Sequence, residues 1–381
     1  MANNNENKVL NVPHLRFPEF NGEWETKLIN DLAVVIGGGT PDTTIKSYWD
    51  GEIQWFTPSE IGKNKYVDSS LRTITEEGLN NSSAKLLPPN TILLSSRATI
   101  GECSLSLREC ATNQGFQSLV SKKCYVDFLY YLIQTKKRDL IRKSCGSTFL
   151  EISANEVRKI QVSVPTDVEQ QKIAGLLSLI DERIATQNKI IEDLKKLKSA
   201  IRKKMFSFLK DEYTESFEIN QLLDYEQPTA YIVANDEYST DTSLTPVLTA
   251  NKGFILGYTD EKFGIYQKGE CIIFDDFTMD AKYVSFPFKV KSSAIKILTA
   301  KPNVNLRFMF EYLSYWELKS EEHKRHYISE IASLVIELPS KERQSIIASL
   351  MTSLNSKLDI EAKTKIRYEE QKRYLLSQMF I

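Results

Sequence analysis

The sequence has few of the features that mark secreted, membrane or metal-binding proteins. Its 381 residues include five cysteines, an odd number, and none of them belongs to a CxxC pair. This usage argues against a zinc site or a disulfide framework and predicts free thiols in the cytoplasm. No apolar run approaches the roughly 18–20 residues that a membrane-spanning helix requires. The segment Asn3–Asn7 is polar, so we expect no secretion signal there.

Motifs of nucleotide and cofactor chemistry are also missing. The sequence has no GxxxxGK[ST] loop and no methyltransferase-like [DN]-P-P-[YF] tetrad. Gly37–Pro41 follows an apolar stretch, but Asp42 stands where a nucleotide-binding loop would place its third glycine, and we favour a tight turn. Asp275 and Asp276 have no His or Glu at ligand spacing, so we predict neither catalysis nor a metal site.

Charge of one sign does not dominate. With 49 Lys and Arg against 50 Asp and Glu the net charge is −1, which argues against a histone-like binder but not against local basic faces. Charged residues make up 26% and hydrophobic residues 41%, as in ordinary soluble globular proteins. The length predicts two or more domains.

The chain contains an internal duplication. Residues 156–206 align without a gap to residues 330–380, at a constant offset of 174. Identities include Glu156/Glu330, Pro165/Pro339, Gln170/Gln344, Ile173/Ile347, Ala174/Ala348, Leu176/Leu350, Lys189/Lys363, Lys198/Lys372 and Met205-Phe206/Met379-Phe380. Each copy has the order strand, proline, helix cap and long helix, and in the first copy Thr166 and Glu169 form a predicted capping box. A period this long indicates two similar halves.

Apolar residues in each long helix recur at alternating spacings of four and three. The first seam is Ile173, Leu177, Ile180, Ile184, Gln187, Ile191, Leu194, Lys198, Ile201 and Met205; the second is Ile347, Met351, Leu354, Leu358, Glu361, Lys365, Tyr368, Lys372, Leu375 and Met379. This spacing is typical of a coiled coil, and a helix of roughly 40 residues would be about 60 Å long. The predicted interface is Ile180, Ile184, Ile191, Leu194, Ile201, Leu354, Leu358, Tyr368 and Leu375. The alternative is an ordinary helix packed on a globular core.

A strand-rich region precedes each copy of the repeat. We expect a first domain over residues 1–155, repeat segments over 156–210 and 330–381, and a second domain over 211–329. In outline, Phe217–Asp224 matches Trp24–Asp31. A helix is predicted over Phe128–Leu140 in the first half, and over Leu306–Lys319 in the second.

Polar loops lie between the predicted strands of both domains. Arg pairs bidentately with guanine, and Asn or Gln pairs with adenine, which makes these loops candidates for reading bases. The candidates are Thr57, Ser59, Lys63, Lys65, Arg97, Thr99, Asn113, Gln114, Asn251, Lys252, Thr278 and Lys282. Hydrogen bonds that stabilise the loops are the alternative role. The basic run 136–143 could contact phosphates or could be a solvated helix face.

The order of these features resembles the specificity subunit of type I restriction–modification enzymes. The family's helix entry pattern is matched by Pro165, Glu169-Gln170, Ile173, Asp181 and Ile184; in the second copy Arg343 and Asn355 depart from it. Gly37–Pro41, Trp55–Thr57 and Asn113–Phe116 resemble segments of that family's recognition domains.

The resemblance implies an α+β fold. Two strand-rich target recognition domains would be joined by two long helices in an antiparallel coiled coil, as a pseudo-two-fold internal repeat. Each domain would read one half of a bipartite asymmetric DNA site, and the helix pair would set the spacer and dock the modification subunits. The chain would have no catalytic residue, metal or cofactor. Partners would be double-stranded DNA, two modification subunits that bind S-adenosylmethionine, and two restriction subunits that use ATP and Mg²⁺.

Two other functions stay open from the sequence. A catalytic methyltransferase with its own recognition domain is disfavoured because the tetrad and cofactor loop are missing. A non-catalytic coiled-coil scaffold that holds two protein-binding modules would require the loop Arg, Asn and Gln residues to be irrelevant for binding duplex DNA.

Overall fold

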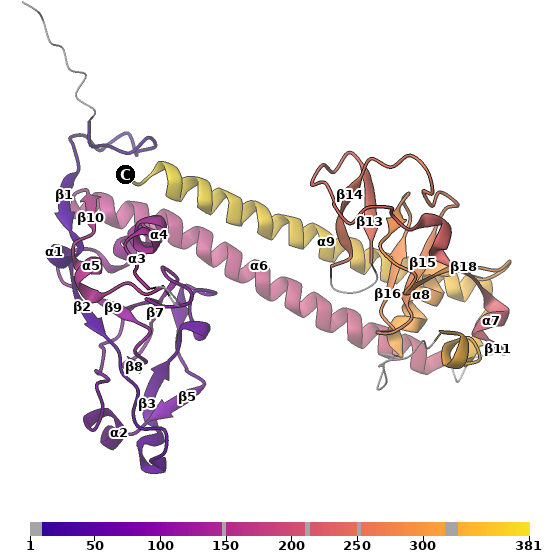
Figure 1. Cartoon of the computed structure of the whole chain (residues 1–381), viewed down its shortest axis with the longest axis horizontal. Coiled ribbons are helices and arrows are strands. Elements are labelled where there is room, and N and C mark those ends of the chain that lie inside the picture. Colours follow the sequence, from indigo (N-terminus) through magenta and orange to yellow (C-terminus); the bar gives the residue numbers. More distant parts are fainter. Residues whose placement is uncertain (1–9, 147–149, 210–213, 250–252, 317–326) are drawn as a thin grey trace, which may run out of the picture. The chain divides into compact units, whose positions relative to one another are not determined.

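The computed structural model divides the chain into two compact units (Figure 1). It describes residues 10–146, 150–209, 214–249, 253–316 and 327–381. The first unit comprises Met1–Lys189 and Ala362–Ile381, and the second comprises Ile190–Glu361. Each unit therefore holds one strand-rich body together with part of both long helices. These helices are α6, Asp167–Phe208, and α9, Lys341–Gln378, of 42 and 38 residues.

The body of the first unit is built from three small sheets and short helices. Its strands are β1 Glu25–Leu28, β2 Ala33–Gly37, β3 Trp49–Phe56, β4 Tyr66–Val67, β5 Arg72–Ile74, β6 Ile92–Leu94, β7 Cys103–Ser106, β8 Cys110–Thr112, β9 Gln117–Ser121 and β10 Gln161–Val164. Its helices are α1 Ile29–Leu32, α2 Glu76–Asn80, α3 Val126–Thr135, α4 Lys137–Arg142 and α5 Ala154–Arg158. The sheet orders are β2-β9-β6-β7-β4, β5-β3-β8 and β1-β10.

The second body follows a related plan with fewer elements among its described residues. Its strands are β11 Glu215–Glu218, β12 Leu223–Glu226, β13 Thr245–Leu248, β14 Ile255–Thr259, β15 Cys271–Asp275, β16 Ala281–Val284, β17 Lys289–Val290, β18 Ile295–Ala300 and β19 Val335–Leu338. Its helices are α7 Ile219–Leu222 and α8 Leu306–Tyr315. The sheet orders are β12-β18-β15-β16, β14-β13-β17 and β11-β19.

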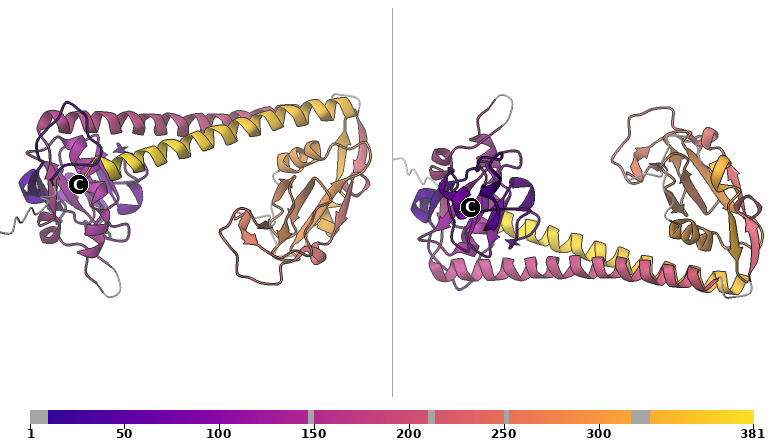
Figure 2. Two further views of the ribbon diagram at one scale, coloured as in Figure 1. Left: turned by 90° about the horizontal axis from the view of Figure 1, so that it is seen from above. Right: turned by 90° about the horizontal axis from the view of Figure 1, so that it is seen from below.

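The two long helices run antiparallel within each unit. In the first unit Leu177, near the start of α6, shares a core with Leu375, near the end of α9, and with Phe380, which follows α9. In the second unit Phe206, near the end of α6, shares a core with Met351 from the start of α9. The end of α9 lies against the first body in both views of Figure 2. The predicted α+β fold class with an antiparallel helix pair and an internal repeat is confirmed.

Burial along the helices follows the seam spacing. All twenty seam positions are buried or half-buried, including the nine residues of the predicted interface. Ile180 and Leu375 belong to the core of the first unit, and Ile184 packs against it; Ile201 and Leu354 pack against the core of the second. Apolar residues spaced at 3.5 residues on average keep one stripe of a helix turned toward its partner.

The repeated glutamines join each long helix to its body in the same way. Gln170 Nε2 donates to the Pro165 carbonyl at 2.9 Å, and its Oε1 accepts from the backbone N–H of Tyr125, which precedes α3. Gln344 repeats this arrangement with Pro339 and with Asn305, which precedes α8. The two copies therefore position α3 and α8 at matching places against α6 and α9.

Three predicted details of local structure are wrong. The Phe128–Leu140 helix is interrupted at Lys136, whose ψ of 8° leaves the helical range, so that α3 and α4 are separate. The outline match of Phe217 to Trp24 is shifted by three residues. β11 and α7 correspond in order and length to β1 and α1, which pairs Ile219 with Ile29, and both isoleucines are fully buried.

The third detail concerns Glu169, for which a capping box with Thr166 is predicted. Both of its carboxylate oxygens instead accept from the Arg16 guanidinium, at 2.8 Å each, and Trp24 Nε1 donates to the same group at 3.3 Å. The carboxylate is almost fully buried and therefore requires a charged partner. Glu169 thus ties the N-terminal segment to α6.

Part of the predicted helix Leu306–Lys319 lies outside the described residues.

Candidate nucleic-acid interface

Three of the predicted loops meet at one end of the first body. β3 and β8 are parallel neighbours, so the loops that follow Phe56 and Thr112 leave the sheet side by side. The Asn113 N–H donates to the Phe56 carbonyl at 3.0 Å, and the Ser96 N–H donates to the Gly115 carbonyl at 2.8 Å. The segments 57–60, 95–99 and 113–116 therefore form one cluster, which we call the loop cluster.

The glycine-rich segment Gly37–Pro41 is packed under the loop cluster. A Cβ atom on Gly38 would lie 2.0 Å from the Asn113 carbonyl oxygen, and one on Gly39 would lie 2.3 Å from the Ala84 nitrogen. The Gly39 N–H also donates to the Thr112 carbonyl. Glycine is required here because the backbones approach too closely for any side chain. The segment continues past β2 without a turn at Gly38–Pro41, so the predicted tight turn is wrong, and close backbone packing accounts for the glycines instead.

Several polar candidates in the loop cluster are engaged locally and still reach the surface. Thr57 Oγ1 donates to Glu60, and Ser59 lies 3.1 Å from Thr57 and is exposed. Asn113 Oδ1 accepts from the Gly115 N–H, and the Nδ2 group of Asn113 takes no part in that hydrogen bond. Gln114 is exposed and accepts from Thr40. These hydrogen bonds fix the loops, and they leave Ser59 and Gln114 accessible.

Arg97 lies at the tip of the loop cluster. Its side chain is 43% exposed and forms an ion pair with Glu151 at 2.8 Å. Ala98 beside it has a φ of +55°, a conformation that non-glycine residues rarely adopt and that often marks functional loops. Thr99 is exposed and bonds to Ser95. The tip therefore presents a guanidinium that a surface carboxylate already orients.

The two candidate lysines of the loop after β3 lie apart from the cluster. Lys63 is exposed and lines a depression beside α6. The Lys65 side chain is 6% exposed, with an ion pair to Asp127 at 2.5 Å and a hydrogen bond to Ser178 on α6 at 2.7 Å. Its ammonium is committed to the contact between the body and α6.

In the second body the two described candidates lie in a turn and on a strand. Thr278 is exposed in the turn after β15, where its backbone N–H donates to Asp275 Oδ1, and Lys282 is half-buried on β16. Asn251 and Lys252 lie outside the described residues. Asp276 is buried beside Lys296 at 3.4 Å, which gives the acidic pair a structural role.

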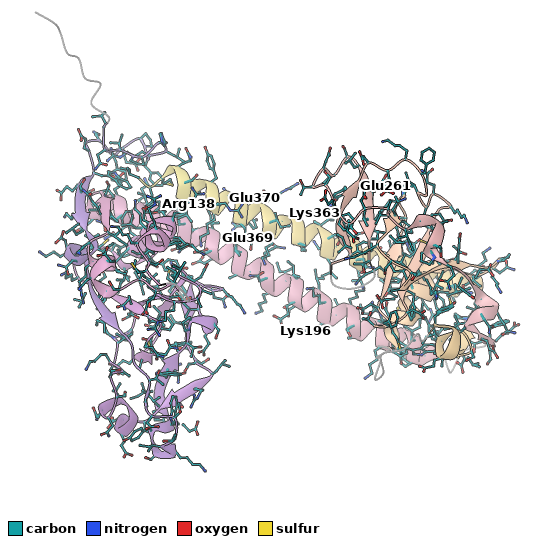
Figure 3. The ribbon with its side chains drawn as sticks, in the orientation of Figure 1. Arg138, Lys196, Glu261, Lys363, Glu369 and Glu370 are labelled. Carbon is teal, nitrogen blue, oxygen red and sulfur yellow. The ribbon has the colours of Figure 1, made fainter. Side chains whose placement is uncertain are left out.

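Most of the basic run 136–143 is neutralised within the first unit. Lys136 donates to the Ile381 carbonyl, Lys137 pairs with Glu102, Arg142 with Asp139 and Lys143 with Glu156. Burial lowers the pKa of Lys136. Arg138 projects from α4 and is exposed (Figure 3). The run therefore offers less free positive charge than its sequence suggests.

The cysteines and acidic groups provide no reactive centre among the described residues. All five cysteines are free, and burial raises the pKa of Cys103, Cys110, Cys124 and Cys271 to about 12. In the part of the chain that the structure describes, no three His, Cys, Asp or Glu side chains are grouped to hold a metal ion. None of the described helices is both long and apolar enough to span a membrane.

Comparison with known families accounts for both halves. Residues 21–196 and 211–370 each match the model of the type I restriction modification DNA specificity domain. The chain belongs to this family. Two copies of the specificity domain explain the internal repeat, since each copy contains one body and most of the long helix that follows it.

Curated relatives of this specificity-domain chain carry matching names. It is 38% identical over 216 residues to the type I restriction enzyme MjaIX specificity subunit of Methanocaldococcus jannaschii, a match that covers 55% of this chain and 50% of that protein. It is 39% identical over 178 residues to the EcoR124I/EcoR124II specificity subunit of Escherichia coli, covering 42% of this chain and 43% of that protein. The matches thus span about half the length of these relatives.

Solved structures show the same fold over nearly the whole chain. The crystal structure of the type I restriction–modification S subunit from M. genitalium superposes with a TM-score of 0.65 and 16% identity, over 97% of this chain and 99% of that one. A chain from a study of type I restriction–modification complex assembly gives a TM-score of 0.58, with 13% identity, over 95% and 98%.

Proposed function

We propose that this chain is the non-catalytic specificity subunit of a type I restriction–modification complex. Each body would read one half of a bipartite, asymmetric DNA site. The observation that carries the proposal is the duplication: two bodies are joined in the same way to one helix pair, yet they differ in the residues at their loop tips. Family membership and the names of the curated relatives support it.

Direct readout would centre on the loop cluster in the first body. The partly exposed Arg97 side chain and the exposed Gln114 have the functional groups that pair with guanine and adenine. Ser59, Thr57, Asn113 and Thr99 would add hydrogen bonds, and Lys63 and Arg138 would contact phosphates. In the second body Thr278, Lys282, Asn251 and Lys252 keep this proposed role. We leave Lys65 out, because its ammonium is buried in an ion pair.

The helix pair would set the spacer and dock two modification subunits. Exposed apolar side chains along both helices support a protein contact. They are Leu179, Ile190, Leu197, Ile346, Leu350, Ile360 and Ile366, each at least 38% exposed. S-adenosylmethionine would be bound by the modification subunits, and ATP and Mg²⁺ by two restriction subunits. The complex would act in the cytoplasm.

Exchange of the first body tests the proposal directly. Residues 24–150 would be replaced by the equivalent segment of another family member, and the variant would be expressed with its modification subunits. Mapping of methylated sites in the host DNA is expected to show one altered half-site and one unchanged half-site. A change in both half-sites would refute modular readout, and methylation that is independent of this chain would favour the scaffold function.

Arg97→Ala is expected to weaken specific binding by about 1–3 kcal/mol and to relax the sequence requirement at one position. The loss should be larger for the preferred base than for the other three. Arg108→Ala is the matched control, because Arg108 is also an exposed arginine in an ion pair at 2.8 Å, with Asp68. Binding titrations of the complex against a panel of substituted duplexes measure both; an equal loss on all duplexes would make Arg97 a phosphate contact.

Seven residues inserted near Gln187 in α6, with seven near Glu361 in α9, are expected to lengthen the spacer. Seven residues form one heptad, which is about two helical turns and keeps the seam in register. They add about 10 Å to the helix, or about three base pairs at 3.4 Å each. Both half-sites should stay unchanged in the methylation map. Five-residue insertions serve as the control, because they rotate the seam away from its partner. An unchanged spacer with the seven-residue insertions would rule out the measuring role.

A further inference from the structure

Each body meets the helix pair at a polar junction in addition to the glutamine contact. Gln170 and Gln344 place the N-caps of α3 and α8 at matching positions, so Tyr131 on α3 and Glu311 on α8 are equivalent, six residues further on. On the long helices Asp181 and Asn355 are equivalent, eleven residues after the glutamines. Both pairs are in contact, so the structure contains two versions of one junction.

In the first junction the carboxylate belongs to the long helix. Tyr131 Oη donates to Asp181 Oδ2 at 2.7 Å. Lys372 from α9 forms an ion pair with Asp181 Oδ1 at 2.8 Å, and both side chains are less than one-fifth exposed. Burial raises the pKa of Tyr131, so the phenol stays neutral. Lys65 lies beside this junction, but its charge is matched by Asp127.

In the second junction the carboxylate belongs to the body. Glu311 on α8 has a side chain only 3% exposed, and it forms ion pairs with Arg202 at 2.6 Å and Lys198 at 3.9 Å. Asn355 on α9 contributes a neutral amide, whose Nδ2 lies 3.3 Å from Glu311 Oε1. Burial lowers the pKa of Lys198, and the nearby Glu311 opposes that shift.

The lysines complete the correspondence. Lys198 and Lys372 occupy the same position of the repeat, and each reaches the junction from the long helix that the aspartate or asparagine does not occupy. Each junction therefore needs both long helices. The lysine is present in both junctions, whereas Arg202 corresponds to Leu376, and the carboxylate lies on the helix in the first half and on the body in the second.

We propose that the two junctions are matched pairs that determine which body is accepted by which half of the helix pair. A tyrosine-bearing body on the second half would leave the half-buried Lys198 and Arg202 without the Glu311 carboxylate. A glutamate-bearing body on the first half would place two carboxylates around Lys372. Removing one partner of a buried ion pair, or crowding like charges, is strongly unfavourable. Bodies are exchangeable between halves only together with the residue at 181 or 355.

The test is a pair of double-mutant cycles in the full chain, read by hydrogen exchange of the α3 and α8 amides. Glu311→Gln and Glu311→Tyr are each expected to reduce protection in α8 at least about tenfold and to leave α3 unchanged. Adding Asn355→Asp, which returns the carboxylate to the helix, should restore protection to within about threefold.

The first half should behave reciprocally. Asp181→Asn is expected to reduce protection in α3 at least about tenfold, and Tyr131→Glu in that background should restore it, so that the double variant is more stable than either single one. Losses that simply add in both cycles would overturn the proposal. If Glu311→Tyr does not fold, the Glu311→Gln and Asp181→Asn cycles decide it alone. Because no DNA is used, failure here would leave the proposed function standing.

Discussion

Phe380→Ala is expected to destabilise the first unit by about 3–5 kcal/mol, the usual cost of deleting a buried phenylalanine ring. The side chain is 6% exposed. Its ring stacks on Phe128 at 5.2 Å and meets the edge of Trp24 at 6.5 Å between centroids. The ring therefore packs into the core of the first body, although Phe380 follows α9 and lies more than 200 residues after that body in the sequence.

The tryptophans allow this loss to be assigned to one unit. Trp24, Trp49 and Trp55 all lie in the first unit, and Trp316 lies in the second. In a Trp316→Phe background, denaturant unfolding followed by tryptophan fluorescence reports on the first unit alone. The midpoint should fall markedly for Phe380→Ala. Tyr374→Ala is the control on the same helix, since Tyr374 is 60% exposed, and its effect should be small.

Phe206 supplies the reciprocal measurement. Its ring is 3% exposed and lies 4.9 Å from Tyr312 in the core of the second unit. Phe206→Ala should reduce hydrogen-exchange protection in α8 and leave the first-unit fluorescence transition unchanged, whereas Phe208→Ala, at an exposed position, should do neither. If Phe206→Ala lowered the stability of the first unit as much as Phe380→Ala does, this assignment of the helix ends would be contradicted.

Asp276→Ala is expected to cost the second unit about 3–5 kcal/mol, because it leaves the buried charge of Lys296 without its carboxylate and with only the neutral Gln227 side chain at 3.0 Å. Both side chains are 1% exposed and lie 3.4 Å apart. Asp276 Oδ1 also accepts from the Tyr327 N–H at 2.8 Å, a buried donor that would lose its acceptor. The free energy of unfolding, taken from denaturant titration and assigned by exchange in β15 and β18, measures the effect.

Two further variants separate burial from charge. Asp68→Ala breaks the ion pair with Arg108, which is shorter at 2.8 Å but more than half exposed on both sides, and it should cost less than about 1 kcal/mol. Asp276→Leu combined with Lys296→Met should be less damaging than Asp276→Ala alone, since no unpaired charge remains. If Asp276→Ala proved as mild as Asp68→Ala, the structural role of this pair would have to be abandoned.

The long helices were predictable because their signal is local. Each seam residue is specified by its spacing from the previous one, and no distant contact is needed to recognise a 3.5-residue period. The tight turn predicted at Gly38 and Gly39 is wrong, because these glycines serve close backbone packing against Asn113 and Ala84, which the local sequence does not reveal. The break between α3 and α4 at Lys136 has no such local marker.

The candidate interface was less predictable, because side-chain type does not reveal which charge is already used. Lys65 and Arg97 look alike as basic loop residues in the sequence. The fold buries the first against Asp127 and leaves the second 43% exposed. The repeat shows that Gln170 and Gln344 occupy the same position. Only the structure reveals that these two glutamines bind the N-caps of α3 and α8.

The amino-acid sequence alone determined that this protein is duplicated, that each half has a strand-rich body followed by a long helix, and that the two helices pair along one apolar stripe. Repetition and periodicity are written along the chain and need no folding to be recognised. Only the tertiary structure decided which polar groups neutralise one another. Arg16 and Glu169 are 153 residues apart, and Arg202 and Glu311 are 109 apart. Electrostatic pairing depends on distance in space, which sequence spacing does not set over such separations.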